Sequence, residues 1–234
     1  MPDFKLRSDE QEIMDNLNCS GVVVAQTLKE LETINKWLGG NYVTIDGLRQ
    51  LIGKRKEEIT IADLGCGGGD MLKLIAKWAR RMNIKLKLFG VDANPNIIEF
   101  AQNNCSSYPE IEFLCLDIFS EEFQSTQFDI ITSTLFTHHF DDAKLKLMYS
   151  GWLKQARLGI VINDLHRHWL AYYSIKLLTQ LFSKSEMVKN DGPVSVLRSF
   201  KRKELKALFH AAEVNTYSLK WMWAFRWQIV ISNQ

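Results

Sequence analysis

A glycine-rich turn between a β-branched run and an amphipathic run is the feature that most restricts how this chain can fold. Ile59–Asp63 predicts a buried strand, Gly65–Gly69 is rich in glycine, and Met71–Met82 has the three-to-four spacing of a helix. Glycine lets the backbone turn sharply and approach a ligand where a Cβ would collide. A turn of this kind lies at the carboxyl edge of an open α/β sheet, where such folds bind ligands.

The chain beyond this turn keeps alternating short apolar runs with longer amphipathic ones, as expected for βαβ units and a parallel sheet. The further predicted elements are strands at Leu86–Asp92, Ile111–Leu116, Phe128–Thr134 and Leu158–Asn163, and helices at Pro95–Asn104 and Ala143–Gln155. Strict alternation from Tyr217 to Ile231 predicts two tightly joined final strands. The expected fold is α/β: a Rossmann-like, seven-stranded, mostly parallel sheet with an antiparallel C-terminal hairpin strand and helices on both faces.

Residues 1–58 have a helical pattern, with apolar side chains three or four apart until a stop at Gly39-Gly40. We expect this segment to be an N-terminal helical attachment to a domain at 59–234.

A long aromatic-rich helix that starts near Trp169 interrupts the alternation late in the chain, and a loop is expected at Gly192-Pro193. These features predict a lid at about 165–200. Trp169 and Tyr172 or Tyr173 are the aromatic residues expected to line a substrate pocket under it.

The composition restricts the partners and the location. A net charge of +2 does not suggest a nucleic-acid partner, which usually requires many basic side chains on one face, so a small-molecule acceptor is expected. The four cysteines are scattered and the polar N-terminus lacks a signal-peptide pattern, so we expect a cytoplasmic protein without disulfides or a zinc site. The longest apolar helical run is too short to span a membrane. The sequence leaves the oligomeric state open.

Acidic residues around the glycine turn help to choose between two ligand classes. A dinucleotide site needs glycine or alanine where this chain has Asp70, and a carboxylate there would repel the diphosphate. Asp63 and Asp70 would instead attract the ammonium and sulfonium groups of S-adenosylmethionine. The residues therefore favour S-adenosylmethionine over NAD as the cofactor.

Two further acids end predicted strands in the order that such a cofactor requires. Asp92, followed by Ala93, could accept both ribose hydroxyls, and Pro95 suits the first turn of the next helix. Asp117 could accept the exocyclic amine of adenine, while Ile118 packs against the ring.

With these motifs in place, the chain resembles the class I methyltransferase family from Ile59 to its end. The resemblance implies that the turn from Asp63 to Gly69 borders the methionine part of the cofactor, that Asp92 holds the ribose and that Asp117 contacts adenine. The cofactor-binding residues expected from the sequence and the resemblance are Asp63, Gly65, Gly67, Gly69, Asp92, Ala93, Asp117, Ile118, Thr134 and Leu135.

The segment Phe128–Phe140 is similar to the fourth-strand motif of quinol methylases and related small-molecule enzymes, in which Thr134 and Leu135 would line the cofactor and the methyl-transfer face. The motif Asn163–Arg167, together with Asp191–Pro193 and Phe225–Trp227, resembles bacterial methyltransferases associated with pigments and polyketide-like products.

Transfer of a methyl group to a phenol benefits from a general base, and His139 and His166 both follow strands that converge on the expected crevice. A metal site is not expected, because the tip of the fourth strand offers Ser133 and Thr134 instead of an acid. The predicted function is O-methylation of an aromatic, quinol or polyketide-like hydroxyl. The alternatives are a nicotinamide-dependent oxidoreductase that uses the same glycine loop and a cofactor-binding protein without turnover.

Overall fold

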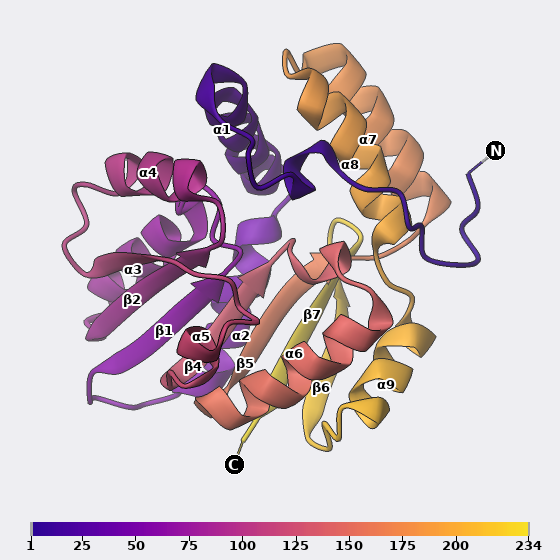
Figure 1. Cartoon of the computed structure of the whole chain (residues 1–234). Coiled ribbons are helices and arrows are strands. Elements are labelled where there is room, and N and C mark those ends of the chain that lie inside the picture. Colours follow the sequence, from indigo (N-terminus) through magenta and orange to yellow (C-terminus); the bar gives the residue numbers. More distant parts are fainter. Residues whose placement is uncertain (1, 234) are drawn as a thin grey trace.

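A mixed sheet of seven strands runs through the molecule, as seen in the computed structural model, which describes residues 2–233 (Figure 1). In sequence order the strands are β1 (Ile59–Leu64), β2 (Leu86–Asp92), β3 (Ile111–Cys115), β4 (Phe128–Thr134), β5 (Ala156–Leu165), β6 (Tyr217–Met222) and β7 (Arg226–Ser232). Their spatial order is β3-β2-β1-β4-β5-β7-β6, and β7 is antiparallel to both of its neighbours while the other pairs are parallel. The expected Rossmann-like sheet with an antiparallel C-terminal hairpin strand is confirmed.

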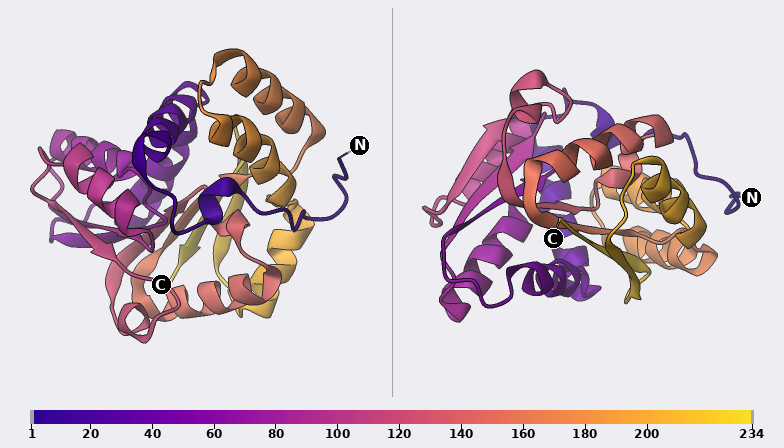
Figure 2. Two further views of the ribbon diagram at one scale, coloured as in Figure 1. Left: turned by 45° about the horizontal axis from the view of Figure 1, so that its top comes forward. Right: turned by 90° about the horizontal axis from the view of Figure 1, so that it is seen from below.

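Helices cover both faces of the sheet (Figure 2). One face packs against α2 (Gly40–Ile52), α3 (Asp70–Met82) and α4 (Pro95–Asn104), and the other against α5 (Glu121–Gln124), α6 (Asp142–Gln155) and α9 (Arg202–Ala211). Each face has its own apolar cluster, because strand residues alternate between the two sides of the sheet. This double cover leaves the carboxyl edge of the parallel strands as the place for a ligand.

The helix α2 belongs to this cover, although it lies within the segment expected to be an attachment. A Cβ on Gly47 would lie 2.5 Å from the Val161 side chain, so only glycine lets α2 approach the sheet this closely. The stop predicted at Gly39-Gly40 ends α1 (Gly21–Trp37), and α2 then begins at Gly40. The division of the chain at residue 58 stays a prediction, but residues 40–52 complete the core of the sheet.

Three helices lie above the carboxyl edge: α1, α7 (Trp169–Phe182) and α8 (Glu186–Arg198) (Figure 1). The N-terminal segment crosses beneath them and forms the short 3-10 helix η1 (Ile13–Asp15), while a second one, η2 (Thr137–His139), follows β4. None of the helices in residues 2–233 is long and apolar enough to cross a membrane.

The prediction of a loop at Gly192-Pro193 is wrong, because α8 runs through both residues. Proline removes one helical hydrogen bond, to the carbonyl four residues earlier. Two kinds of tertiary contact hold the helix here. Its apolar side chains Val188 and Val194 are buried, and the Asp191 carboxylate accepts hydrogen bonds from backbone amides of the N-terminal segment.

Candidate active site

A cavity of about 440 Å³ lies at the carboxyl ends of the strands, between the glycine turn, the tips of β2 and β3, and η2. Of the residues expected to bind the cofactor, those that line it are Gly65, Gly67, Asp92, Ala93, Asp117, Ile118 and Leu135. Asp63, Gly69 and Thr134 lie close by in the fold but are not among the lining residues. The cavity also receives the N-terminal segment, through residues such as Met14 and Asp15.

The glycine turn is shaped for close packing at two of its positions. Gly65 has a φ of 68°, and a Cβ there would overlap the ring of Phe136, which covers the turn. Gly69 has a φ of 76° and caps α3, where a Cβ would lie 2.7 Å from the Cys105 sulfur. Both residues therefore hold left-handed backbone that other side chains rarely adopt, but Gly69 serves the packing of α3 and not the cavity wall.

Asp92 ties the tip of β2 to the glycine turn. Its carboxylate accepts hydrogen bonds from the backbone amides of Asn94 at 3.0 Å and Gly67 at 3.4 Å. Burial raises the pKa of Asp92 above its usual value, which these hydrogen bonds only partly offset. The side chain is thereby held at the cavity wall, in the place where a ribose would reach it.

Asp117 and Ile118 form the far wall of the cavity, beyond β3. Asp117 is exposed and accepts a hydrogen bond from the amide of Phe119 at 2.9 Å, whereas Ile118 is buried. A carboxylate next to an apolar side chain suits a flat ring that carries an amine.

The two acids that flank the glycine turn have other partners. Asp63 is buried and accepts a hydrogen bond from the Thr132 hydroxyl at 2.8 Å, and burial raises its pKa to about 7. Asp70 accepts a hydrogen bond from Asn104 and forms an ion pair with Lys73 at 3.2 Å. Asp70 therefore joins α3 to α4 in this structure and is not among the residues that line the cavity.

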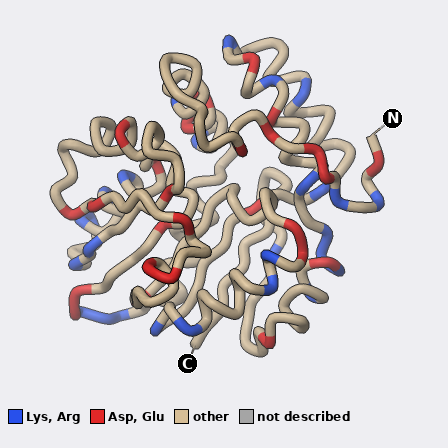
Figure 3. The backbone as a smooth tube through the Cα atoms, viewed as in Figure 1, with Lys and Arg blue, Asp and Glu red and all other residues tan. Residues whose placement is uncertain are grey.

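The N-terminal segment brings acids to the histidines that follow β4. Figure 3 shows acidic positions along this segment, where it passes over the sheet edge. Asp15 accepts a hydrogen bond from His139 Nδ1 at 2.5 Å and forms an ion pair with Arg198 at 2.5 Å. Burial opposes the charge of Asp15, but His139 and Arg198 outweigh it and lower its pKa. His139, one of the two expected bases, lines the cavity next to Asp15.

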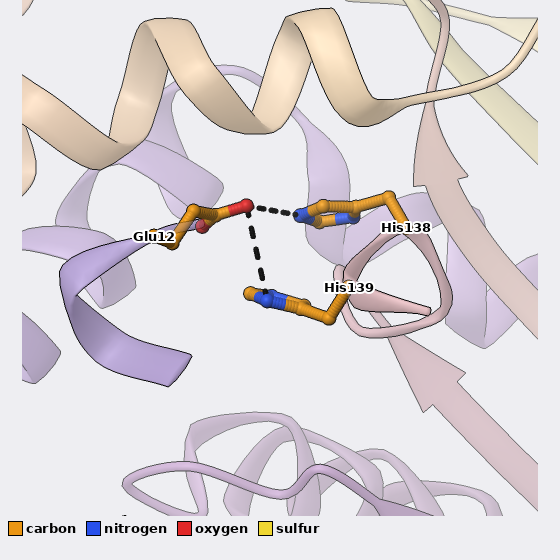
Figure 4. Close-up of side chains that lie close together, drawn as sticks. All are labelled: Glu12, His138 and His139. Carbon is orange, nitrogen blue, oxygen red and sulfur yellow. Dashed lines mark ion pairs between the residues drawn. The ribbon is translucent and has the colours of Figure 1, made fainter. Parts of the chain in front are cut away.

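A second histidine, His138, is held between two carboxylates. Its Nδ1 lies 2.6 Å from Asp164 Oδ1. Its Nε2 lies 3.4 Å from Glu12 Oε1 on the other side of the ring (Figure 4). Burial disfavours the imidazolium, but Asp164 and Glu12 outweigh burial and raise the pKa of His138 to about 10. Thr137 donates to the other oxygen of Asp164 at 2.5 Å, so this buried group links η1, η2 and β5.

Glu12 Oε1, His138 Nε2 and His139 Nδ1 lie within 4.8 Å of one another, close enough for one metal ion to bind all three (Figure 4). Arg198 stands where it would repel such an ion, because its guanidinium lies 3.9 Å from Glu12 and pairs with Asp15. The imidazolium of His138 and the guanidinium of Arg198 already provide two positive charges beside the carboxylates of Glu12, Asp15 and Asp164.

His166, the other expected base, lies apart from the cavity. It is not among the residues that line it, and its ring accepts a hydrogen bond from Trp221 Nε1 at 3.3 Å. Burial, followed by the charges of His168 and Arg167, lowers the pKa of His166 to about 4. Sequence reasoning missed Glu12, Asp15 and Arg198, which carry no local signal because their partners are distant in the chain.

A second cavity of about 290 Å³ adjoins the first under α1, α7 and α8, and Leu135 lines both. Most of its wall is apolar, with Leu31, Ile34, Leu38, Ile175 and Leu178. The lid helix therefore does cover a cavity.

The expectation that Trp169 and Tyr172 or Tyr173 line the pocket under the lid is wrong, because none of the three lines this cavity. Trp169 and Tyr173 are 55% and 47% exposed and do not line this cavity. The opposite face of α7, with Ala171, Ser174 and Ile175, lies over the cavity instead. A helix buries one face only, and α8 takes part in deciding which one.

Residues 61–157 match the family described as a methyltransferase domain. The match runs from β1 into β5 and includes the glycine turn, Asp92, Asp117 and Leu135. Residues 61–157 are therefore similar to methyltransferase domains.

Solved methyltransferase structures share the fold of this domain. A plantazolicin methyltransferase in complex with S-adenosylhomocysteine superposes with a TM-score of 0.63 at 18% identity, over 91% of this chain and 95% of the other. Human N-acetylserotonin methyltransferase in complex with S-adenosylmethionine gives 0.63 at 16% identity, over 89% of this chain and 55% of that enzyme. The CMeT domain of the citrinin polyketide synthase gives 0.62 at 12% identity, over 82% and 52%. The present chain thus spans about half the length of the last two, and no curated protein sequence matches it significantly.

The residues that line the larger cavity have chemistry that fits S-adenosylmethionine. Asp92 offers a carboxylate for hydroxyl groups, and Ile97 and Ile118 offer apolar surface for a ring. Gly65 and Gly67 expose backbone where the amino-acid part would lie. These residues would hold S-adenosylmethionine, which would supply a methyl group for transfer, and Leu135 lies where this cavity adjoins the second one.

Proposed function

We propose that this methyltransferase transfers a methyl group to the hydroxyl oxygen of a small aromatic, quinol or polyketide-like molecule. The observation that carries the proposal is the meeting of the two cavities at Leu135. The larger one combines acidic and apolar residues and suits the cofactor, and the second, more apolar one suits a flat acceptor. The cofactor supplies an electrophilic methyl group on a sulfonium, and the chain must align the acceptor oxygen with it and exclude water.

The pair formed by Asp15 and His139 supports the choice of a hydroxyl acceptor. Donation of the Nδ1 proton to Asp15 at 2.5 Å fixes the orientation of the His139 ring and leaves Nε2 as the basic nitrogen. A base placed at the wall of the cofactor cavity can remove the proton of a hydroxyl as the methyl group is transferred. A phenol needs this help at neutral pH because its own pKa is about 10.

The acceptor is a small molecule in this proposal because the second cavity holds only about 290 Å³. The proposed location is the cytoplasm, which agrees with four free cysteines, Cys19, Cys66, Cys105 and Cys115.

The test combines binding with turnover. Calorimetry with S-adenosylhomocysteine and with NADH is expected to show binding of the first alone. Incubation with methyl-labelled S-adenosylmethionine and a panel of phenols, hydroquinones, aromatic amines and thiols is expected to give labelled ethers, identified by mass spectrometry. Binding of NADH alone would contradict the assignment of the cofactor, and label on amines or thiols alone would contradict the hydroxyl acceptor.

A further inference from the structure

Arg226, the first residue of β7, is a buried cation without an acidic partner. Its side chain is 2% exposed, and no carboxylate of residues 2–233 lies within 4.0 Å of its guanidinium nitrogens. The nearest acid along β5, Asp164, already binds His138 and Thr137. A buried charge is costly unless it is paired, so this arrangement calls for an explanation.

Only neutral groups hold the guanidinium in place. Nη1 donates to Asn163 at 3.2 Å and Nη2 donates to Asn35 at 2.8 Å, while Nε is buried without a hydrogen-bond partner. Burial lowers the pKa of Arg226 to about 10, which leaves it charged at neutral pH. A guanidinium has five donors, so most of them remain for a ligand.

The position of the guanidinium connects it to the second cavity. Arg226 lines that cavity together with Asn35 and the mainly apolar residues of α7 and α8. It packs directly on Gly40, where a Cβ would lie 2.7 Å from Cζ, so the first turn of α2 is adjacent. The positive end of the peptide dipole of α2 adds to the field that an anion would experience here.

We propose that Arg226 binds a carboxylate of the methyl acceptor, so that the acceptor is a hydroxylated aromatic acid with its hydroxyl directed toward Leu135. This inference rests on the proposed function for the identity of the bound molecule as an acceptor. A planar guanidinium with free N–H groups matches a carboxylate in a two-point hydrogen-bonded pair. The apolar residues that line the same cavity would then hold the ring.

The first experiment measures the preference of the unaltered protein. With S-adenosylhomocysteine at saturation, calorimetry compares 4-hydroxybenzoate, 4-hydroxycinnamate and 6-hydroxy-2-naphthoate with the corresponding amides. We expect at least one acid to bind about tenfold or more tightly than its amide, the usual scale for a charge-assisted pair. If none of the three acids binds more tightly than its amide, the proposal is overturned.

The second experiment assigns the preference to Arg226. The variant Arg226→Gln is expected to bind acid and amide equally, and Arg226→Lys to recover part of the preference. Arg157→Gln is the matched control, since Arg157 pairs with Asp129 at the opposite end of the sheet. A preference that persists in Arg226→Gln would overturn the assignment.

The carboxylate could also come from the methionine part of the cofactor, and a third measurement separates the two sources. S-adenosylhomocysteine is compared with methylthioadenosine, which lacks the amino-acid group. We expect both to bind Arg226→Gln as they bind the unaltered protein. A selective loss of S-adenosylhomocysteine affinity would assign Arg226 to the cofactor and overturn the proposal. Because none of these measurements needs turnover, a protein that prefers the acids but methylates no hydroxyl would contradict the proposed function alone.

Discussion

At the scale of single residues, Asp92 joins the ligand site to the fold. Its hydrogen bonds from Gly67 and Asn94 hold the glycine turn against the tip of β2, and its carboxylate lines the larger cavity. Ribose hydroxyls would replace water around this carboxylate with charge-assisted hydrogen bonds.

The first prediction follows from this role. We expect Asp92→Ala to weaken the binding of S-adenosylhomocysteine by roughly 1.5 to 3 kcal/mol, because it removes charge-assisted hydrogen bonds. Calorimetry on the folded variant measures the loss. Glu112→Ala is the matched control, since Glu112 pairs with Lys87 on the exposed surface of the sheet edge. Equal affinities for Asp92→Ala and the control would move the ribose contact to another residue.

The second prediction compares variants of the two candidate bases, His139 and His166, of which only the first lines the larger cavity. We expect His139→Gln to lower the turnover of a phenol about 10²- to 10⁴-fold with little change in affinity for S-adenosylhomocysteine, because the residue acts on the acceptor proton. His166→Gln is expected to stay close to the unaltered enzyme, since His166 lies outside the cavity. Steady-state kinetics on one phenol tests both variants.

The same pair gives a pH test. The defect of His139→Gln should shrink as the pH approaches about 10, where a phenol ionises without help. Full activity of His139→Gln at pH 7 would show that alignment alone suffices, and a large loss in His166→Gln would favour His166 instead.

At the scale of elements, the buried group around His138 fastens the N-terminal segment to the sheet. Glu12 precedes η1, His138 lies in η2 and Asp164 lies in β5, so three separate elements meet at one imidazolium. The same contacts place Asp15 beside His139, and the packing of η1 therefore also orients the proposed base.

The third prediction concerns the stability of this group. We expect His138→Gln to lower the free energy of unfolding by about 3 to 5 kcal/mol at neutral pH, because Asp164 loses its buried counter-charge. The pKa of His138 is raised from about 6.5 in the unfolded chain to about 10, so its contribution is complete below pH 6.5 and is lost as the pH rises through 10.

Urea unfolding at pH 6, 8 and 10 measures the free energy of unfolding of His138→Gln and of the unaltered protein. The difference between the two free energies should become smaller toward pH 10. His210→Gln, on the exposed side of α9, is the control. A difference that does not change with pH would mean that His138 is uncharged in the folded protein.

At the scale of the whole molecule, the parallel strands and the helices above them form different cavities. The sheet brings the turn after β1 and the tips of β2, β3 and β4 to one edge, which forms the larger cavity. The helices α1, α7 and α8 close the second cavity above that edge, with the turn between β6 and β7 as part of its wall.

The sequence by itself was sufficient for the sheet, and seven of the ten residues that it predicted to bind a cofactor line the larger cavity. Strand and helix periods are local, so β2, β4 and α4 begin and end as predicted. Residues at the carboxyl ends of parallel strands share one edge wherever such a sheet forms, which explains why Gly67 and Asp92 line the same cavity as expected.

Only the tertiary structure decided which residues surround the proposed base and line the second cavity, where the acceptor is proposed to bind. The contact between Asp15 and His139 spans 124 residues and that between Asn35 and Arg226 spans 191, and no local pattern encodes such pairings. The face that α7 turns toward the cavity depends on its packing against α8, which continues through Pro193. Local periodicity determines which elements form, but the base and the buried cation get their surroundings from long-range packing.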